Sequence, residues 1–541
     1  MTCSAWSQDA TINIDAAKST GRFEPAWAWM GYDEPNYTYS DEGMYLLRQL
    51  HKLSAQPVHA RTHNLLTSGD GTPSLKWGST NAFTRDAAGK PVYDWTIIDK
   101  IFDAYKETGL KPVVEIGFMP QALSTHPNPY QHHWPQSFAT GWAYPPTSYE
   151  EWSDLVYQWA KHMVQRYGAK KVATWEWEVW NEPDIFYWHG APEEYFKLYD
   201  YAVTAVRRAL PNARVGGPAS TGPAGDHANN FLRSFLKHCA QGPNAATGKT
   251  EVPLDFISFH AKGKATFTDD HVQLDIATNL RDIDRGFTVI NEFPSLRRLP
   301  VLLTESDPES CAACGVDTHP ENGYRLNAQY ASYSAAMLNG ALALAKKHRI
   351  NLQGTVAWAF TFPGQSLFAG QRAFTTGTID LPLLNAFRMF GRLKDERLEA
   401  NSTGAININD LLNLGVREQS DIDVIATRSA HGITALIWNY HDADVKVASQ
   451  TIHVNINGLP NELDKVRVTH WRIDDTHSNA FAVWQTMHSP ASPSATELQT
   501  LQAAGQLQLL SVPASLAVDK GTTTLDFSEP RQGVSLIEFT W

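Results

Sequence analysis

Short apolar runs alternate with helix-like stretches between residues 26 and 360 of this chain. The runs are rich in β-branched and aromatic residues, whereas the stretches between them repeat apolar residues at helical spacing. Eight such runs occur, at 26–31, 57–62, 112–118, 174–180, 213–217, 255–259, 301–304 and 355–360. Strands that alternate with helices are typical of parallel sheets, and eight such units predict an α/β fold of the (β/α)8 TIM-barrel type.

The pattern changes after residue 400 to short alternating runs with turn-like residues between them. These runs lie at 422–427, 433–440, 450–455, 466–473, 505–510, 522–527 and 534–539. They predict a C-terminal antiparallel β-sandwich, in which 489–504, with its Pro and Ser residues, is interpreted as a surface connection. We therefore expect a strand within residues 1–20 that joins the sandwich, a barrel at 21–395 and an accessory sandwich at 396–541.

Charge and hydropathy exclude several classes of partner. The net charge is −12, and no basic stripe is present, so we expect no nucleic acid partner. No apolar run of 18 or more residues occurs, so we expect no membrane partner. Residues 1–10 lack the basic region and apolar core of a signal peptide. The protein is expected to be periplasmic or secreted if a signal peptide was trimmed, and cytoplasmic otherwise.

The four cysteines are too few for a scaffold built on disulfides. Cys311 and Cys314 are the only close pair, and they fit a small disulfide, a redox pair or half of a zinc site. No second pair with ligand spacing follows, and no HExxH string, Gly-rich phosphate loop or nucleophile-elbow motif occurs. We therefore expect no cofactor and no metal.

The fourth run ends in the uncommon sequence Trp180-Asn181-Glu182-Pro183. Functional side chains of a barrel lie at the carboxyl ends of its strands, so Glu182 is a candidate catalytic residue. Strand alternation would place it above Trp180 and Glu178, and an aromatic surrounding favours the protonated carboxyl that a general acid needs. The alternative is that Glu182 caps the next turn.

A second carboxylate, Glu305, follows the seventh run, although alone it could equally be a helix-capping or salt-bridged residue. Carboxylates from strands four and seven would face each other across the barrel mouth, and glycoside cleavage requires such a pair. His63, His260 and Trp358 end the second, sixth and eighth runs on the same rim. We predict that these three residues bind substrate, although a single histidine is more often structural.

Several stretches resemble glycoside hydrolase family 39, a retaining family with a barrel and an attached sandwich that includes β-xylosidases and α-L-iduronidases. The resemblance is carried by 93–123, with its Ile-Gly-Phe-Met-Pro string, by 194–199 and by 215–218, which are similar to the xylosidase branch. It implies that Glu182 is the acid/base, that Glu305 is the nucleophile and that Asn181 holds the sugar 2-hydroxyl.

Other positions depart from the xylosidase pattern and resemble the iduronidase branch, namely 61–63, 259–263, 305–308 and 368–372. In that branch a lysine and an arginine grip the uronate carboxylate, and Lys262 and Arg372 match them. The alternatives are that Lys262 pairs with Asp307 or Glu178 and that Arg372 is an ordinary loop residue.

Together these features predict a retaining exo-glycosidase that removes terminal non-reducing sugars from an oligosaccharide or glycoside. A β-D-xylosidase acting on xylo-oligosaccharides or related plant glycans is the first interpretation. A uronosidase of the α-L-iduronidase type is the alternative, and a carbohydrate-binding barrel without turnover is a further one. The sequence indicates no oligomeric state.

Overall fold

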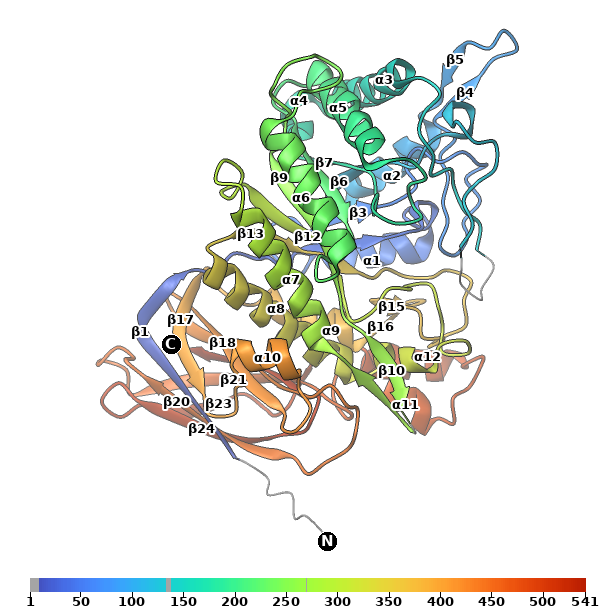
Figure 1. The fold of residues 1–541 in the computed structure, drawn as a ribbon. Helices are drawn as coiled ribbons and strands as arrows, with labels where there is room; N and C mark the ends of the chain where they lie inside the picture. Colours follow the sequence, from blue (N-terminus) through green and yellow to red (C-terminus); the bar gives the residue numbers. More distant parts are fainter. Residues whose placement is uncertain (1–8, 133–137, 269) are drawn as a thin grey trace.

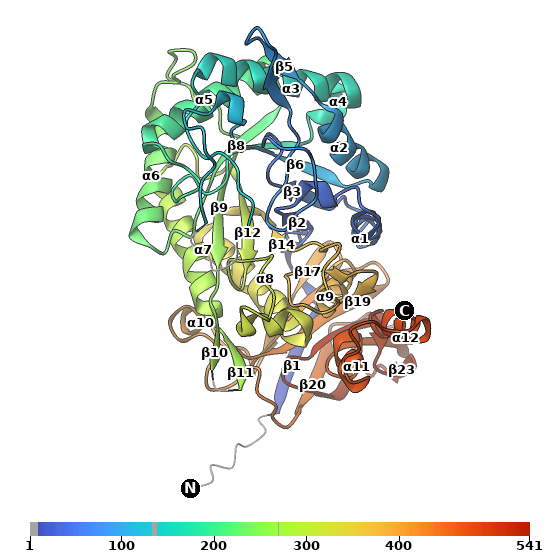
Figure 2. The same ribbon diagram turned by 90° about the vertical axis from the view of Figure 1, so that its right-hand side faces the viewer.

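The computed structural model describes residues 9–132, 138–268 and 270–541. A barrel with its surrounding helices forms the upper part of Figure 1, and a sandwich of strands forms the lower part. The view in Figure 2, turned by 90°, shows the same two layers. The predicted fold class, a barrel followed by a β-sandwich, is confirmed.

Nine parallel strands build the barrel in the order β13-β12-β9-β8-β7-β6-β3-β2-β14. Their bounds are β2 (Trp29–Tyr32), β3 (His59–Thr62), β6 (Lys111–Ile116), β7 (Glu176–Val179), β8 (Arg214–Ser220), β9 (Phe256–Lys262), β12 (Pro300–Asp307), β13 (Asn351–Thr355) and β14 (Ala357–Trp358). The last two strands are one position of the barrel interrupted at Val356. Because β13 pairs with β12 and β14 pairs with β2, the eight positions close into a ring.

The helices return the chain between these strands with their apolar faces buried against the barrel. They are α1 (Asp41–His51), α2 (Thr96–Thr108), α3 (Tyr149–Tyr167), α4 (Ala169–Val172), α5 (Pro192–Ala209), α6 (Asp226–Gln241), α7 (Ile276–Asn291), α8 (Ala328–His348) and α9 (Pro382–Phe390). Side chains of Ser40, Ser148, Asp275 and Asn327 cap the first turns of α1, α3, α7 and α8. None of the described helices is both long and apolar enough to cross a bilayer.

Three barrel strands extend three residues beyond the predicted ends, and one of them is β8, which continues to Ser220 instead of residue 217. β9 continues to Lys262 and β12 to Asp307, whereas the apolar runs stop at 259 and 304. The sequence signal was lost there because charged residues follow the apolar ones, yet these charges pair with one another and remain in the sheet. The eighth position begins at Asn351 instead of residue 355.

Short elements decorate the barrel. Three two-stranded hairpins are formed by β4 (Phe83–Arg85) with β5 (Pro91–Tyr93), β10 (Ala265–Thr268) with β11 (His271–Leu274), and β15 (Thr375–Thr376) with β16 (Ile379–Asp380). Three 3-10 helices are η1 (Pro35–Tyr37), η2 (Gln121–Leu123) and η3 (Pro320–Leu326). The last of these leads into α8.

The sandwich is a mostly antiparallel sheet of ten strands with its own apolar core. Its strands are β1 (Ala10–Arg22), β17 (Glu396–Ser402), β18 (Asp421–Ser429), β19 (Gly432–Tyr440), β20 (Gln450–Asn457), β21 (Lys465–Ile473), β22 (Gln508–Leu509), β23 (Ala514–Ala517), β24 (Thr523–Glu529) and β25 (Val534–Thr540). The N-terminal strand β1 lies between β17, to which it is antiparallel, and β20, to which it is parallel. Figure 2 shows β1 within the lower layer.

One prediction for this region is wrong. Residues 489–504 are not only a connection, because they contain α12 (Ala495–Ala504), which begins with a capping box between Ser494 and Glu497. The Ser-x-x-Glu string was the available signal. The strands β17 and β23 and the helices α10 (Ile408–Leu414) and α11 (Ala480–Thr486) were also not predicted.

Hydrogen bonds join the sandwich to the barrel helix α8. Gln329 donates to the Asp442 carbonyl at 2.9 Å, Ser332 to Gln532 at 2.8 Å, and Asn339 to the Asp423 carboxylate at 2.9 Å. We call this contact region the seam. Because its polar contacts are buried or half-buried, the sandwich is attached along a surface and not through a linker alone.

Candidate active site

Glu182 lies in a turn that leaves the barrel. Strand β7 ends at Val179, after which Trp180 and Glu182 both take positive φ, 72° and 44°. Such a backbone is uncommon away from glycine and is frequent at functional sites. The prediction that alternation places Glu182 above Trp180 and Glu178 is therefore wrong. Trp180 is a core residue whose indole donates to the Tyr187 carbonyl.

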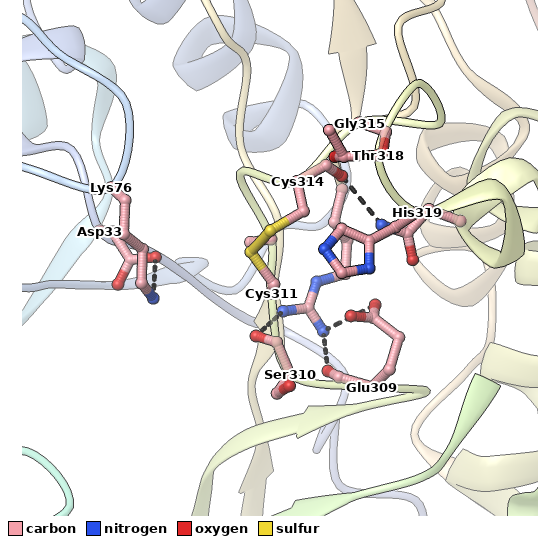
Figure 3. Close-up of a disulfide and its surroundings, with 12 residues drawn as sticks. Asp33, Lys76, Glu309, Ser310, Cys311, Cys314, Gly315, Thr318 and His319 are labelled. Atoms are coloured by element: carbon pink, nitrogen blue, oxygen red, sulfur yellow. Dashed lines mark hydrogen bonds and ion pairs between the residues drawn. A yellow bond between two sulfur atoms is a disulfide. The ribbon is translucent and has the colours of Figure 1, made fainter. Parts of the chain in front are cut away.

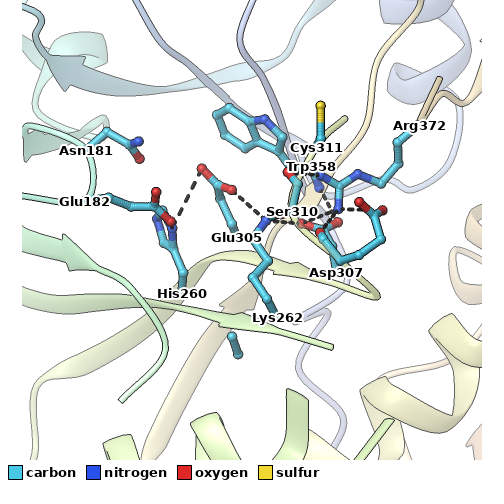
Figure 4. Close-up of polar contacts among 12 residues, drawn as sticks. Asn181, Glu182, His260, Lys262, Glu305, Asp307, Ser310, Cys311, Trp358 and Arg372 are labelled. Atoms are coloured by element: carbon cyan, nitrogen blue, oxygen red, sulfur yellow. Dashed lines mark hydrogen bonds and ion pairs between the residues drawn. The ribbon is translucent and has the colours of Figure 1, made fainter. Parts of the chain in front are cut away.

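Glu305 is placed by the register of two neighbouring strands. The ladder between β12 and β9 pairs Glu305 with His260 and Asp307 with Lys262. Residues two apart on a strand share a face, so all four side chains point to the same side of the sheet. The Lys262 ammonium then lies 2.6 Å from Glu305 Oε2 and 2.8 Å from Asp307 Oδ2. Figure 4 shows Lys262 between the two carboxylates.

Arg61 on β3 is a second cation below the site, and its side chain is fully buried. Its guanidinium contacts Glu178 at 2.5 Å, Glu115 at 3.3 Å and Glu305 Oε1 at 3.4 Å. It also donates to the Asn181 oxygen at 3.1 Å. Because Arg61 takes that oxygen, the Asn181 amide nitrogen is the group left for a sugar hydroxyl.

The cations keep Glu305 ionised. Burial alone would raise its pKa, but Lys262 first of all, together with His260, His63 and Arg61, outweighs burial and holds the pKa well below its usual range. A carboxylate in this state has no proton to donate at neutral pH and is free to act as a nucleophile.

Glu182 has a different environment. Its Oε1 lies 2.8 Å from His260 Nδ1, and the same nitrogen lies 3.8 Å from Glu305. One ligand atom from each of Glu182, His260 and Glu305 lies within 4.8 Å of the others, a spacing at which these described residues could hold a metal ion. A divalent ion there would face Lys262 and Arg61, and their positive charges disfavour it.

His63 and Trp358 form the wall beside Glu305. The His63 ring contacts Asp33 at 2.8 Å and Glu115 at 3.0 Å, and it lies 4.3 Å from the Trp358 ring. Trp358 reaches this place because it pairs with Gly31, where any Cβ would come within 2.3 Å of the indole. Burial, followed by the charge of Arg61, lowers the pKa of His63.

Arg372 is not exposed to the barrel mouth. Its side chain is fully buried, lies 3.2 Å from Asp307 and donates to the backbone carbonyls of Glu309 and Ser310. The structure therefore brings Lys262 to the carboxylate pair but places Arg372 behind Asp307 (Figure 4).

The loop that follows Asp307 is closed by a disulfide between Cys311 and Cys314 (Figure 3), one of the three interpretations of that pair. Buried Arg325 holds the loop, since it donates to the carbonyls of both cysteines at 2.7 and 2.8 Å and pairs with Glu309 at 2.6 Å. A cavity of about 260 Å³ lies between this loop and Lys262.

Arg61 and Glu115 were not predicted as site residues, and Glu178 and Asp307 were named only as possible partners of Lys262. The pairing of Lys262 with Asp307 is confirmed. The available signal was a charge inside an otherwise apolar strand. Such a charge is costly unless it is paired, so several of them in neighbouring strands indicate a buried polar network.

Comparisons with known proteins identify the family to which the chain belongs. The family described as Glycosyl hydrolases family 39 matches residues 10–518. A β-xylosidase of Geobacillus stearothermophilus is 28% identical over 430 residues, which cover 77% of this chain and 75% of that protein. An α-L-iduronidase of Mus musculus is 23% identical over 522 residues, which cover 91% and 75%. The crystal structure of a monomeric β-xylosidase from Caulobacter crescentus CB15 shares the fold, with a TM-score of 0.75 and 22% identity over 98% of this chain and 99% of that one.

Proposed function

Since the chain belongs to glycosyl hydrolase family 39, we propose that this glycoside hydrolase is a retaining exo-β-D-xylosidase acting on xylo-oligosaccharides or related plant glycans. Glu182 is the acid/base and Glu305 is the nucleophile in this proposal. Asn181, His63, His260, Lys262 and Trp358 surround the glycone.

The observation that carries the proposal is that Glu182 and Glu305 lie close together but have surroundings of different charge. Oxygens of Glu182 and Glu305 lie within 4.8 Å of each other, near the separation of about 5 to 5.5 Å typical of retaining enzymes. Inverting enzymes need about 6.5 Å or more to admit a water between the two groups. Cations surround Glu305, whereas the described ion-pair partner of Glu182 is His260.

The residues support a double displacement. In the first step Glu305 attacks the anomeric carbon, the glycosidic bond breaks, and the Glu182 proton passes to the leaving oxygen. In the second step Glu182 takes a proton from water, the water oxygen attacks the anomeric carbon, and the ester to Glu305 breaks. Positive charge develops on the sugar in both transition states, and the Asn181 amide is available to the 2-hydroxyl.

The pairing of the cations favours xylose as the glycone. β-D-Xylose and α-L-iduronate share ring stereochemistry from C1 to C4, but xylose carries only hydrogens at C5. Lys262 is already shared by Glu305 and Asp307, and Arg372 is buried against Asp307. Neither cation is free for a substrate carboxylate, and such a carboxylate would meet two others.

A uronosidase is the second candidate, and the cavity beyond Lys262 is the observation that favours it. The cavity also contacts the exposed Lys264, which has no ion-pair partner among the residues that the structure describes. A C5 carboxylate that entered this space could reach Lys262 and Lys264 without displacing Arg372.

A side-by-side assay of aryl β-D-xyloside, β-D-glucoside, β-D-glucuronide and α-L-iduronide tests the substrate. We expect the xyloside to be hydrolysed fastest, with the β anomer of xylose released first in an NMR time course. Strict dependence on a C5 carboxylate would replace the xylosidase proposal by the uronosidase one, and release of the α anomer would contradict retention.

The acid/base assignment predicts an effect that depends on the leaving group. Glu182→Ala should slow hydrolysis of xylobiose by roughly 10²- to 10⁴-fold, because its alcohol leaving group needs a proton. Aryl xylosides with acidic phenols need little protonation and should be slowed far less. Equal slowing of both substrates in steady-state assays would contradict this role for Glu182.

A further inference from the structure

A second cavity, of about 700 Å³, lies at the seam and contains none of the residues of the carboxylate pair. Its barrel wall is the start of α8, and its sandwich walls are the loop after β19, the helix α11 and the loop before β25. The lining residues used here are Asn327, Asp444, Val445, Phe481, Gln485 and Arg531. The volume lies within the range of about 300 to 1,000 Å³ that is usual for ligand pockets.

Arg531 is the one cation of this lining without an ion-pair partner among the described residues. Its Nη1 lies 3.5 Å from the Val445 carbonyl, and its Nε is buried without a hydrogen-bond partner. Burial lowers the pKa of Arg531. A half-buried guanidinium is costly until an anion pairs with it, and its planar fork suits a carboxylate.

The other ionisable side chains used here already have a polar partner. Lys446 pairs with Asp475 at 3.1 Å. Asp444 accepts a hydrogen bond from Asn327 at 2.8 Å, and burial raises the pKa of this carboxyl. An anion that entered the cavity would therefore find one available cation, Arg531.

The uncharged lining suits a sugar ring. Phe481 is partly exposed and is held in place by stacking on Trp484, at 5.7 Å between ring centroids. Val445 and Val447 are 41% and 46% exposed, which is unusual for such side chains at a cavity. The exposed Gln485 amide on α11 offers both a donor and an acceptor to hydroxyl groups. Apolar faces beside a few polar groups are typical of small-molecule sites.

We propose that this cavity is a second, non-catalytic saccharide site that takes a carbohydrate bearing a carboxylate. The carboxylate pairs with Arg531, and the ring packs on Phe481 and Val445. Such a site would hold an acidic polysaccharide on the enzyme while the barrel acts elsewhere on the chain. The proposal does not depend on which sugar the barrel cleaves.

Binding of xylotriose that carries one glucuronic acid branch tests the proposal, with plain xylotriose as the neutral ligand. Calorimetry would use the full chain with Glu305→Gln, so that neither ligand is consumed. Adding Arg531→Gln should weaken binding of the acidic ligand about tenfold or more and leave the neutral ligand unchanged. Raising the salt concentration should weaken the acidic ligand in the same way. Phe481→Ala should weaken it further.

Arg298→Gln is the matched control, since Arg298 is exposed on the barrel and lies outside the cavity lining. Equal binding by the Arg531→Gln chain and its parent would overturn the proposal, as would equal weakening by Arg298→Gln. If sulfate competed as well as the saccharide, the cavity would be a simple anion site, and the proposal would also be overturned. Arg531→Gln in the otherwise unchanged enzyme should leave aryl xyloside turnover intact. If the xylosidase proposal is wrong, neither the Arg531→Gln chain nor the unchanged enzyme should hydrolyse aryl xyloside. The binding comparison would still test the saccharide site in that case.

Discussion

Two pairs of carboxylates stand two residues apart on a strand, one at the barrel mouth and one at the seam. At the mouth, Glu305 and Asp307 on β12 share the ammonium of Lys262. At the seam, Asp421 and Asp423 on β18 receive hydrogen bonds only from neutral groups among the described residues, such as Trp438 and Asn339.

This difference decides the charge of each pair. Lys262 and its neighbours hold the pKa of Glu305 well below its usual range despite burial. At the seam, burial and then the charge of Asp421 raise the pKa of Asp423 to about 7. The same spacing therefore gives an ionised carboxylate in one place and, in the other, a carboxyl that is still partly protonated near neutral pH. Lys262 pairs directly with Glu305, whereas Arg397 lowers the pKa of Asp423 without forming an ion pair with it.

The largest expected effect separates the two pairs by function. Glu305→Ala should lower turnover by at least about 10⁴-fold, the order expected when a covalent nucleophile is lost. Added azide should restore turnover and give a glycosyl azide of inverted configuration. Asp423→Asn should leave turnover unchanged. If the Glu305→Ala chain kept its activity on xylobiose, the proposed difference in function between the two pairs would be contradicted.

Removal of Lys262, the cation shared by Glu305 and Asp307, should raise the pKa of the carboxylates at the barrel mouth, as is found at the seam. Lys262→Met deletes a charge-assisted contact worth about 1.5 to 3 kcal/mol, so kcat/KM should fall roughly tenfold to a hundredfold. Without Lys262, burial should raise the pKa of Glu305, and the acidic limb of the pH–rate profile should move to higher pH.

Lys262→Arg, which keeps a cation, should recover part of both effects. Lys347→Met breaks a surface ion pair with Asp284 and serves as the control, with an unchanged profile expected. An acidic limb that stays in place in Lys262→Met would show that Lys262 has a packing role and does not set the charge of Glu305.

The smallest expected effect on turnover is that of Asp423→Asn, which should instead change stability. Because the folded-state pKa of Asp423 is raised to about 7, its contribution is fully present below the unfolded value near 4 and is lost as the pH rises towards 7. An asparagine at this position would not ionise, so the Asp423→Asn variant should not lose this stability as the pH rises. Relative to wild type, the variant should gain about 2 to 4 kcal/mol of unfolding free energy between pH 4 and pH 7. Urea unfolding at several pH values measures the difference.

Asp526→Asn is the control for that series, since Asp526 is exposed in the sandwich and pairs only with His453 among the described residues. Its difference from wild type should stay within about 0.5 kcal/mol at each pH. A difference for Asp423→Asn that does not change with pH would mean that folding does not raise the pKa of Asp423.

The contrast between the pairs also explains what the sequence could predict. Apolar runs and their ends revealed the barrel, and with it the rim on which Glu182 and Glu305 lie. The pairing of Lys262 with Glu305 and Asp307 depends on how far β9 and β12 extend. The last residue of a strand is difficult to predict where charged residues follow apolar ones. The direction of Arg372 was not accessible, because it lies on a loop held by buried Arg325 and by the disulfide.

The place of β1 has a consequence for how the protein is made. Its partners β17 and β20 are synthesised almost last, since Ile12 pairs with Ser402 and with Val454. At about 5 to 20 residues per second, the first strand waits roughly 20 to 80 s on the ribosome before either partner emerges. During that time its edges are unpaired and open to other chains. Nascent chains stalled after α9 should therefore be cleaved by protease within residues 10–22 while the barrel already resists.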